Sequence, residues 1–196
     1  MAQQYIIPDG PHFEPESTPY FLERLAQARE YLEYGSGGST VEAARLNKTF
    51  TSVESDAAFL EAVQQKIGRP RSGRFIHVDI GKTTEWGIPK FQRWTPWRRL
   101  RWSRYAKAPW HDGIKPDLIL VDGRFRVHCA LYTINQLRGR DFEILLDDYT
   151  NRDFYSEVES FAELQFCKGR MASFLPKKFD QDDMNRALRR YSIDFR

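Results

Sequence analysis

Short apolar, β-rich runs alternate with segments of helical periodicity along most of this chain. Residues 56–67, for example, place four apolar side chains on one stripe, as an amphipathic helix requires. Further helices are expected over 20–30, 41–46 and 180–190. A strand followed by a helix, repeated several times, predicts an α/β fold with a parallel sheet. The expected strands are 31–34, 49–53, 74–79, 116–122 and 142–147, then 164–169 and 171–175 as a closing hairpin around Gly169.

The first expected strand leads directly into a glycine-rich turn. Residues 31–40 read Tyr-Leu-Glu-Tyr-Gly-Ser-Gly-Gly-Ser-Thr, and a helix-like segment follows. Glycines at such a junction let the backbone adopt positive φ and approach a ligand closely. The helix start beyond them exposes unpaired N–H groups, which suit a polar or anionic ligand. The turn therefore predicts a nucleotide-type pocket at the end of the first parallel strand.

Two cofactor patterns compete for this turn. The dinucleotide fingerprint requires glycine at its first, third and sixth positions, and counting from Gly35 the third is Gly37 but the sixth is Thr40. The pattern acid-x-Gly-x-Gly-x-Gly matches better, with Glu33, Gly35 and Gly37 in place and Ser39 at the last glycine. In these residues the chain resembles class I S-adenosylmethionine (SAM) dependent methyltransferases. A nicotinamide-dependent oxidoreductase is an alternative, which the terminal hairpin also disfavours.

The resemblance covers about residues 20–176. It implies a Rossmann-like, doubly wound seven-stranded sheet with a C-terminal antiparallel hairpin, SAM as cofactor, and methyl transfer as the activity. Glu54, seventeen residues after Gly37, matches the acid that accepts hydrogen bonds from the ribose hydroxyls, although a solvated acid at a strand end would look the same. The cofactor-binding residues implied by the resemblance are Glu33, Gly35, Ser36, Gly37, Glu54, Asp79 and Ile80.

Candidate catalytic and substrate-binding residues follow the fourth strand. Asp122 stands where the family commonly places a substrate-contacting residue. His128 could act as a base that titrates near neutral pH, and a hydrogen-bonded structural histidine is the alternative. Arg124 and Arg126 suit a carboxylate or phosphate on the substrate. We therefore expect O-methyl transfer to a small acidic or sugar-like acceptor, while the residue types do not separate O- from N-transfer.

Carboxylates at the ends of the fourth and fifth strands raise a metal alternative. Catechol-type O-methyltransferases place an Asp after the fourth strand and Asp-Asn after the fifth, where this chain has Asp122 and Asp147-Asp148. Three such oxygen ligands would suit Mg²⁺. Asp148 in place of Asn, and Phe125 in place of a lysine, weaken the match, so we predict a site without metal. Without a metal, Asp148 is expected to cap a helix or turn and Asp147 to pair with a nearby arginine.

Residues 86–110, between the third and fourth strands, form the most unusual segment. They contain all five tryptophans and seven Lys or Arg residues with no acid, although the net charge of the chain is only +3. Interleaved basic and aromatic side chains, Trp86 among them, suit an acidic substrate, an anionic membrane or an oligomer interface. The alternative is that the tryptophans pack this insertion against the sheet while the arginines face water. One short basic stretch falls short of a nucleic-acid footprint.

The remaining features indicate a globular protein. A length of 196 residues predicts one domain, 1–196, with an irregular arm over 1–19. No signal peptide or bilayer-spanning stretch is recognisable, and Cys129 and Cys167 are expected to be buried, reduced thiols, so we predict a cytoplasmic protein. The expected partner is a small anionic acceptor, and a homo-oligomer is left open. The rival function is a non-catalytic methyltransferase-like protein that binds SAM or docks a partner through the insertion.

Overall fold

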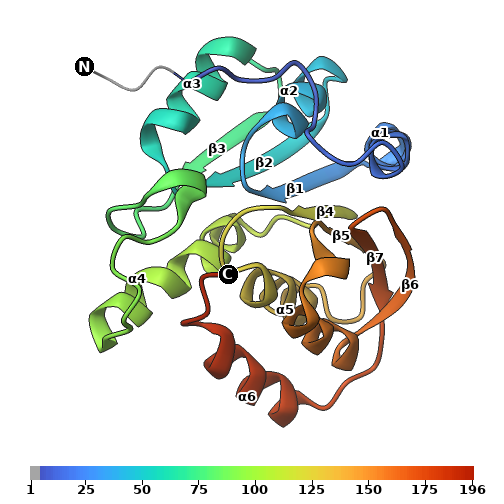
Figure 1. Cartoon of the computed structure of the whole chain (residues 1–196). Helices are drawn as coiled ribbons and strands as arrows, with labels where there is room; N and C mark the ends of the chain where they lie inside the picture. Colours follow the sequence, from blue (N-terminus) through green and yellow to red (C-terminus); the bar gives the residue numbers. More distant parts are fainter. Residues whose placement is uncertain (1–4) are drawn as a thin grey trace.

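A computed structural model describes residues 5–196, which are built around a mixed seven-stranded sheet (Figure 1). The strand order is β3-β2-β1-β4-β5-β7-β6. The first five strands run parallel, and β7 is antiparallel to both β5 and β6. This is the predicted doubly wound sheet with its terminal hairpin. The strands are β1 (Glu30–Tyr34), β2 (Thr49–Glu54), β3 (Gly73–His77), β4 (Leu118–Val121), β5 (Glu143–Leu146), β6 (Ala162–Lys168) and β7 (Met171–Pro176).

Helices cover both faces of the sheet. In Figure 1, α1 to α3 lie on one face and α4 to α6 on the other. The crossover helices return the chain from each strand to the start of the next parallel strand, so the carboxyl ends of β1 to β5 share one edge. The helices are α1 (Ser17–Gln27), α2 (Gly38–Arg45), α3 (Ala57–Ile67), α4 (Pro96–Lys107), α5 (Arg126–Gln136) and α6 (Gln181–Tyr191).

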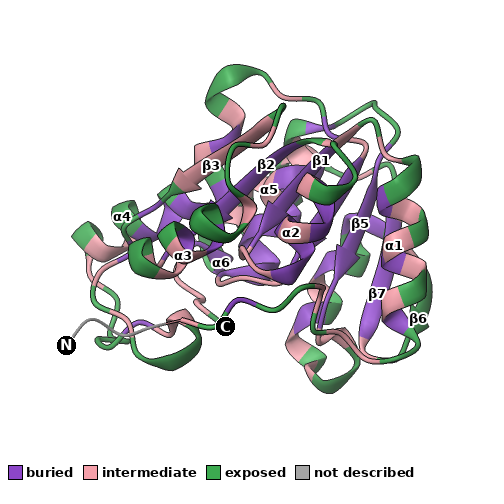
Figure 2. Cartoon of the chain, turned by 90° about the horizontal axis from the view of Figure 1, so that it is seen from above, coloured by how far each residue is buried: buried purple, intermediate pink, exposed green. Residues whose placement is uncertain are grey.

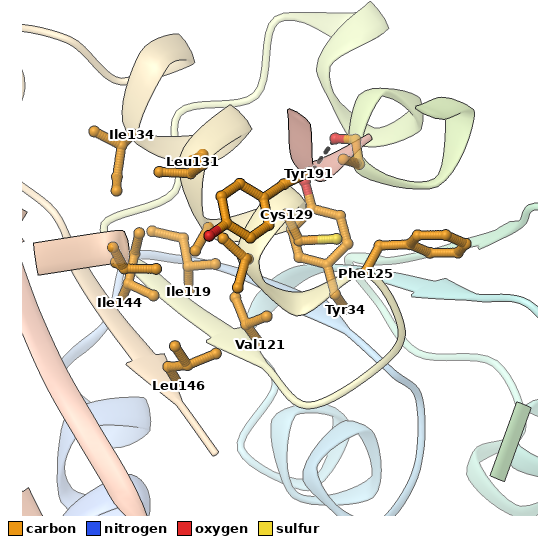
Figure 3. Packing of buried hydrophobic residues seen from close by; sticks show 14 of the residues in the cluster. Tyr34, Ile119, Val121, Phe125, Cys129, Leu131, Ile134, Ile144, Leu146 and Tyr191 are labelled. Carbon is orange, nitrogen blue, oxygen red and sulfur yellow. Dashed lines mark hydrogen bonds between the residues drawn. The ribbon is translucent and has the colours of Figure 1, made fainter. Parts of the chain in front are cut away.

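The central strands are mainly apolar because both of their faces are buried. Every residue of β4 and β5 is buried, and side chains alternate between two core clusters. Ile119 and Ile144 pack under α5 near Leu131 and Ile134, as Figure 3 shows. Figure 2 shows the same arrangement from above, with buried strands between helices whose outer faces are exposed. Removing a side chain such as Leu131 from this core costs roughly 2–5 kcal/mol.

Several predicted boundaries and environments differ from the structure. The helix expected over 20–30 is α1, which begins earlier, at Ser17, and ends earlier, at Gln27; the Ser17 hydroxyl donates to the Lys168 carbonyl oxygen and so ties its first residue to β6. The irregular arm therefore ends at residue 16, and its residues 1–4 lie outside the described part. Cys129 is buried as expected, but Cys167 is exposed because it lies on β6, the edge strand of the sheet. Within residues 5–196, no helix combines the length and apolar character needed to cross a membrane.

The insertion contains a regular helix, α4. Its N-terminus carries a capping signal: Thr95 Oγ1 accepts a hydrogen bond from Arg98 N, and Pro96 occupies the first turn. Trp102 is 1% exposed and donates its indole N–H to Ile80 O, so this tryptophan packs the insertion against the sheet. Trp86 and Trp97 are 83% and 81% exposed. The packing interpretation therefore holds for one part of the insertion and fails for the other.

Candidate functional site

The turns after β1 and β4 are in direct backbone contact. Gly35 has φ +100°, and a Cβ atom on it would lie 2.8 Å from Gly123 N and 2.9 Å from the carbonyl carbon of Asp122. A Cβ on Gly123 would likewise lie 2.9 Å from Gly35 N. Both positions thus require glycine. The contact places the glycine-rich turn beside the candidate residues that follow β4.

Glu33 supports the glycine turn from inside the protein. It is fully buried, and its carboxylate accepts hydrogen bonds from Tyr31 Oη at 3.0 Å, Ser39 Oγ at 2.7 Å and Thr40 Oγ1. Burial raises the pKa of Glu33, and these hydroxyl donors oppose that rise. Thr40 Oγ1 also accepts from Gly37 N at 2.9 Å. Thr40, which replaces the third glycine of the dinucleotide fingerprint, therefore stabilises the conformation of this turn.

Glu54, at the end of β2, lies beside the same turn. Its Oε2 accepts from Ser36 N at 3.1 Å, while Oε1 accepts from the backbone N–H groups of Ser55 and Asp56 at 2.6 and 2.9 Å. Burial raises the pKa of this carboxyl, and the backbone donors counteract the rise. Each carboxylate oxygen can accept two hydrogen bonds. Among the described residues Oε2 accepts only from Ser36 N, so it retains acceptor capacity.

The cofactor-binding residues predicted after β3, Asp79 and Ile80, contact α4. Asp79 is exposed and pairs with Arg101, and Gly81 N donates to its carboxylate at 2.9 Å. The Gly81 N–H and the Arg101 guanidinium together lower the pKa of Asp79. Ile80 is 2% exposed, and its carbonyl oxygen accepts from the Trp102 indole at 3.0 Å. The helix of the insertion, α4, therefore packs beside the expected cofactor site.

A tight 3-10 turn, Glu85–Gly87, lies beside the residues that follow β2 and β4. A Cβ on Gly87 would lie 3.2 Å from Ser55 Oγ and 3.6 Å from Arg124 Cγ. Trp86 adopts φ +61° in this turn, a conformation that L-residues rarely take, and its indole is exposed. The first residues of the insertion thus lie at the same edge of the sheet as the glycine turn.

Arg126 joins the ends of β4 and β5. It is 3% exposed, and its guanidinium donates to Asp122 Oδ1 at 2.8 Å, to the Asp147 carbonyl at 2.6 Å and to the Gly123 carbonyl at 3.1 Å. Its Nη1 also lies 3.2 Å from Asp148 Oδ2. The N–H groups of Arg126 thus bond to other residues of the chain. Arg126 was expected to bind substrate, but in the structure it links two strand ends.

Two carboxyl groups, Asp122 and Asp147, form a like-charged pair at this edge. Asp147 is 8% exposed, and burial followed by repulsion from Asp122 raises its pKa to about 7. Burial also raises the pKa of Asp122, opposed by Arg126. Such a pair holds one proton near neutral pH. The pair is therefore chemically suited to accept a proton from a substrate hydroxyl.

The third carboxylate, Asp148, faces arginines. Its oxygens lie 3.2 Å from Arg126, 3.0 Å from Arg152 and 3.3 Å from Arg170. We expected Asp147 to pair with an arginine. In the structure Asp148 pairs with the arginines instead, and the Asp147 carboxyl faces Asp122. Within residues 5–196, no group of three His, Cys, Asp or Glu side chains is arranged to hold a metal ion.

Arg124 presents an unsatisfied donor. Its buried Nε has no hydrogen-bond partner among the described residues. Burial, and secondarily the charge of Arg126, lowers the pKa of this guanidinium. Tyr105 of α4 lies nearby: it is fully buried, and its hydroxyl bonds to Val53 O at 3.2 Å. No local sequence signal distinguishes Tyr105 from the other aromatic residues of the insertion. An anionic ligand group would satisfy the orphaned Arg124 donor.

His128 lies elsewhere. It is 2% exposed in the first turn of α5 and borders a groove between α4, α5 and α6 that none of the strand-end residues lines. Burial lowers its pKa to about 3, so the imidazole is neutral at physiological pH. Two residues along a helix correspond to a rotation of about 200°. Because Arg126 points to the strand ends, His128 faces the other side, and the structure does not bring it to Asp122.

Comparison with known proteins supports a family assignment. No protein-family model and no curated protein matches this sequence. A methyltransferase-like protein from Silicibacter pomeroyi DSS-3 is 33% identical, with a TM-score of 0.83, 95% of this chain and 100% of that chain being covered. The chain therefore belongs to the methyltransferase-like proteins of the class I SAM-dependent methyltransferase family.

Two more distant structures share the fold alone. The S-adenosylhomocysteine-bound methyltransferase of Podospora anserina is 13% identical with a TM-score of 0.52, covering 81% of this chain and 76% of that one. An N-methyltransferase from Bradyrhizobium japonicum WM9, solved with S-adenosylhomocysteine, is 12% identical with a TM-score of 0.51, covering 84% and 89%. Their sheets are similar to that of the present chain.

Proposed function

We propose that this protein binds SAM at the ends of β1, β2 and β3 and transfers its methyl group to a small anionic or sugar-like acceptor beside β4 and β5. The observation that carries this proposal is the backbone contact between Gly35 and Gly123. It sets the glycine turn and Glu54 next to Asp122 and Asp147 at the edge where α/β sheets bind ligands. The two distant methyltransferases solved with S-adenosylhomocysteine support the same cofactor.

The residues present fit the cofactor. The turn Gly35–Gly37 offers a backbone that a ligand can approach without side-chain interference. Glu54 Oε2 has acceptor capacity left for a ribose hydroxyl. Asp79 and Ile80 lie after β3, where the family places the adenine. Glu33 contributes indirectly, because its carboxylate holds the turn through Ser39 and Thr40.

The chemistry assigned to the protein is proton removal and orientation. When bound, SAM supplies an electrophilic methyl group on a sulfonium ion. As a hydroxyl acceptor forms its new bond to carbon, the Asp122–Asp147 pair takes the hydroxyl proton, which a pKa of about 7 permits at neutral pH. Arg124 Nε, buried and unpartnered, pairs with a carboxylate or phosphate on the acceptor. The products are the methyl ether, S-adenosylhomocysteine and a proton released to solvent.

Calorimetric titration of S-adenosylhomocysteine, with NAD as the competing ligand, tests the cofactor. We expect micromolar binding of S-adenosylhomocysteine and none of NAD. Glu54→Gln should weaken binding about ten-fold, because an acceptor of ribose hydroxyls is altered. Glu61→Gln, an exposed change on α3, is the matched control. Folded protein that binds NAD in preference would establish the oxidoreductase alternative, and folded protein that binds neither ligand would overturn the proposal.

A second function, partner docking without catalysis, is favoured by the exposed aromatic residues of the insertion. Phe91, Trp86 and Trp97 are 56%, 83% and 81% exposed, and exposed apolar groups of this size commonly mark interaction sites. This function predicts S-adenosylhomocysteine binding without transfer of labelled methyl to any acceptor. It also predicts that Trp97→Ala abolishes self-association or partner binding measured by sedimentation. Transfer of labelled methyl to any acceptor by the wild-type protein would contradict this function.

A further inference from the structure

A groove of about 530 Å³ lies on the face of the sheet covered by α4, α5 and α6. Its volume is within the range of small-molecule sites. One wall is a stripe of α4 that includes Leu100 and Lys107, and the other belongs to α6, with Leu188 and Arg189. None of the residues assigned above to cofactor or acceptor lines this groove. It is therefore a separate site.

The groove is bordered by an unsatisfied polar group. His128 is 2% exposed, and its Nδ1 is buried without a hydrogen-bond partner among the described residues. A buried polar atom without a hydrogen-bond partner destabilises the protein until a ligand supplies that partner. Tyr132, one turn further along α5, also lines the groove and meets the His128 ring edge to face at 6.1 Å. A polar group and an aromatic ring are thus presented together.

The charged residues lining the groove are all basic. Arg99, Lys107 and Arg189 line it, and no Asp or Glu does. Arg99 donates to Ser192 Oγ at 3.0 Å and to the Arg189 carbonyl at 3.1 Å, so it holds α4 against α6. The Lys107 and Arg189 side chains form no ion pair or hydrogen bond with the described residues. Their charges are therefore available to a ligand.

The rim is apolar. Trp94 and Leu100 are each 53% exposed, and Leu188 lies opposite them on α6. Small-molecule sites combine such apolar lining with a few polar groups that fix orientation. The unpaired positive charges favour an anionic ligand, and the apolar rim favours a ligand with a planar hydrophobic ring. We propose that the groove between α4, α5 and α6 binds a small aromatic carboxylate, held by Lys107 and Arg189 above His128.

The proposal is independent of methyl transfer, and its test reads binding alone. The chain has four histidines, so protein labelled with ¹⁵N-histidine gives a small set of imidazole signals that histidine variants can assign. Titration with 2-naphthoate should shift the His128 signals in a saturable way and leave His12 and His77 unchanged. The neutral amide 2-naphthamide should bind at least several-fold more weakly. Saturating S-adenosylhomocysteine should leave the naphthoate affinity unchanged.

Charge-removing variants identify the groove. Lys107→Gln and Arg189→Gln should each weaken 2-naphthoate binding about three-fold, the amount that a partly exposed ion pair contributes. Arg104→Gln removes one charge from an exposed position of the same helix that does not line the groove, so its affinity should equal that of the wild type. Unchanged His128 signals at saturating naphthoate would overturn the proposal. Equal affinity for 2-naphthoate and 2-naphthamide would also overturn it, as would an equal loss of naphthoate affinity in the Lys107, Arg189 and Arg104 variants.

Discussion

The two halves of the proposed site use their carboxylates differently. At β1 and β2, Glu33 and Glu54 accept hydrogen bonds from side chains and backbone groups of the glycine turn. At β4 and β5, Asp122 and Asp147 face one another, and Arg124 Nε has no partner among the described residues. In the first half, the carboxylates use their hydrogen bonds to hold the conformation of the glycine turn. In the second half, polar groups remain available to bind a substrate and to exchange a proton with it.

This difference separates binding from catalysis in physical terms. A carboxylate that accepts hydrogen bonds from several fixed donors is held in one position. A like-charged pair changes protonation near neutral pH and can therefore exchange a proton. Changes in the first half should mainly affect folding and cofactor affinity. Changes in the second half should mainly affect turnover and the pH dependence of stability and activity. Arg126 is the exception, because it joins the ends of β4 and β5 and its loss should destabilise the fold.

Arg126→Met should give the largest loss of stability. It removes a buried guanidinium and leaves Asp122 and Asp148 without their shared cation, which costs about 3–5 kcal/mol of unfolding free energy. Arg152→Met, which breaks a half-buried contact to the same Asp148, should cost less than about 1 kcal/mol. Urea unfolding measures both. Equal losses would show that Arg126 does not hold the two strand ends together.

Gly35→Ala should have the next largest effect. The new methyl group would collide with the backbone of Gly123, and the residue would be forced to a φ of +100°. We expect the unfolding free energy to fall by about 2–3 kcal/mol. Gly37→Ala, where a Cβ meets nothing within 4 Å, should cost less than about 1 kcal/mol. Thermal unfolding of the two variants measures these losses. Equal losses for Gly35→Ala and Gly37→Ala would contradict the close contact between Gly35 and Gly123.

Asp147→Asn should change how stability depends on pH. The folded-state pKa of Asp147, about 7, lies above its ordinary value of 3.8, so the folded protein retains a proton that the unfolded chain releases. This contribution to stability is complete below about pH 4 and is lost as the pH rises towards 7. The variant lacks this loss, so its stability relative to wild type should rise by about 2–3 kcal/mol from pH 5 to pH 8.

Urea unfolding at the two pH values measures that gain. Asp153→Asn, an exposed change in the segment after β5, should follow the wild-type pH dependence. Parallel pH profiles for wild type and Asp147→Asn would contradict the shared proton between Asp122 and Asp147. In an active enzyme the same proton predicts a methyl-transfer rate that rises with pH through about 7.

Asp79→Asn should have the smallest effect on stability. The ion pair between Asp79 and Arg101 is exposed, and such pairs contribute less than about 1 kcal/mol. The difference should shrink further in high salt, because exposed charges are screened. Unfolding in low and high salt checks this. A loss that persists in high salt would place Asp79 among the structural carboxylates of the first half.

Much of the fold follows from local sequence patterns. β4 is apolar throughout and β5 is apolar after Glu143, because both faces of these strands are buried. The glycine turn is recognisable because its requirements involve consecutive residues. The capping signal at Thr95-Pro96 marks the start of α4 within the insertion. We did not predict that helix, because its interleaved Trp and Arg residues lack a clear apolar stripe.

Other features of the site depend on contacts that sequence does not specify. Arginine chemistry alone does not reveal that Arg126 faces inward while Arg124 is left without an acceptor. The direction of His128 follows from where α5 begins, after Phe125 adopts φ +56°. Tyr105 reaches Val53 from another element. Each of these depends on the rotation of a helix against the sheet, which sequence periodicity does not fix.

A crystal structure of the protein with S-adenosylhomocysteine tests the central claim most directly. We predict the adenosine part between the glycine turn and Asp79, with a ribose hydroxyl bonded to Glu54. The sulfur should point towards Asp122 and Asp147, with the Trp86 turn over the ligand. Binding of the ligand elsewhere, with Glu54 contacting only its own backbone donors, would contradict the account.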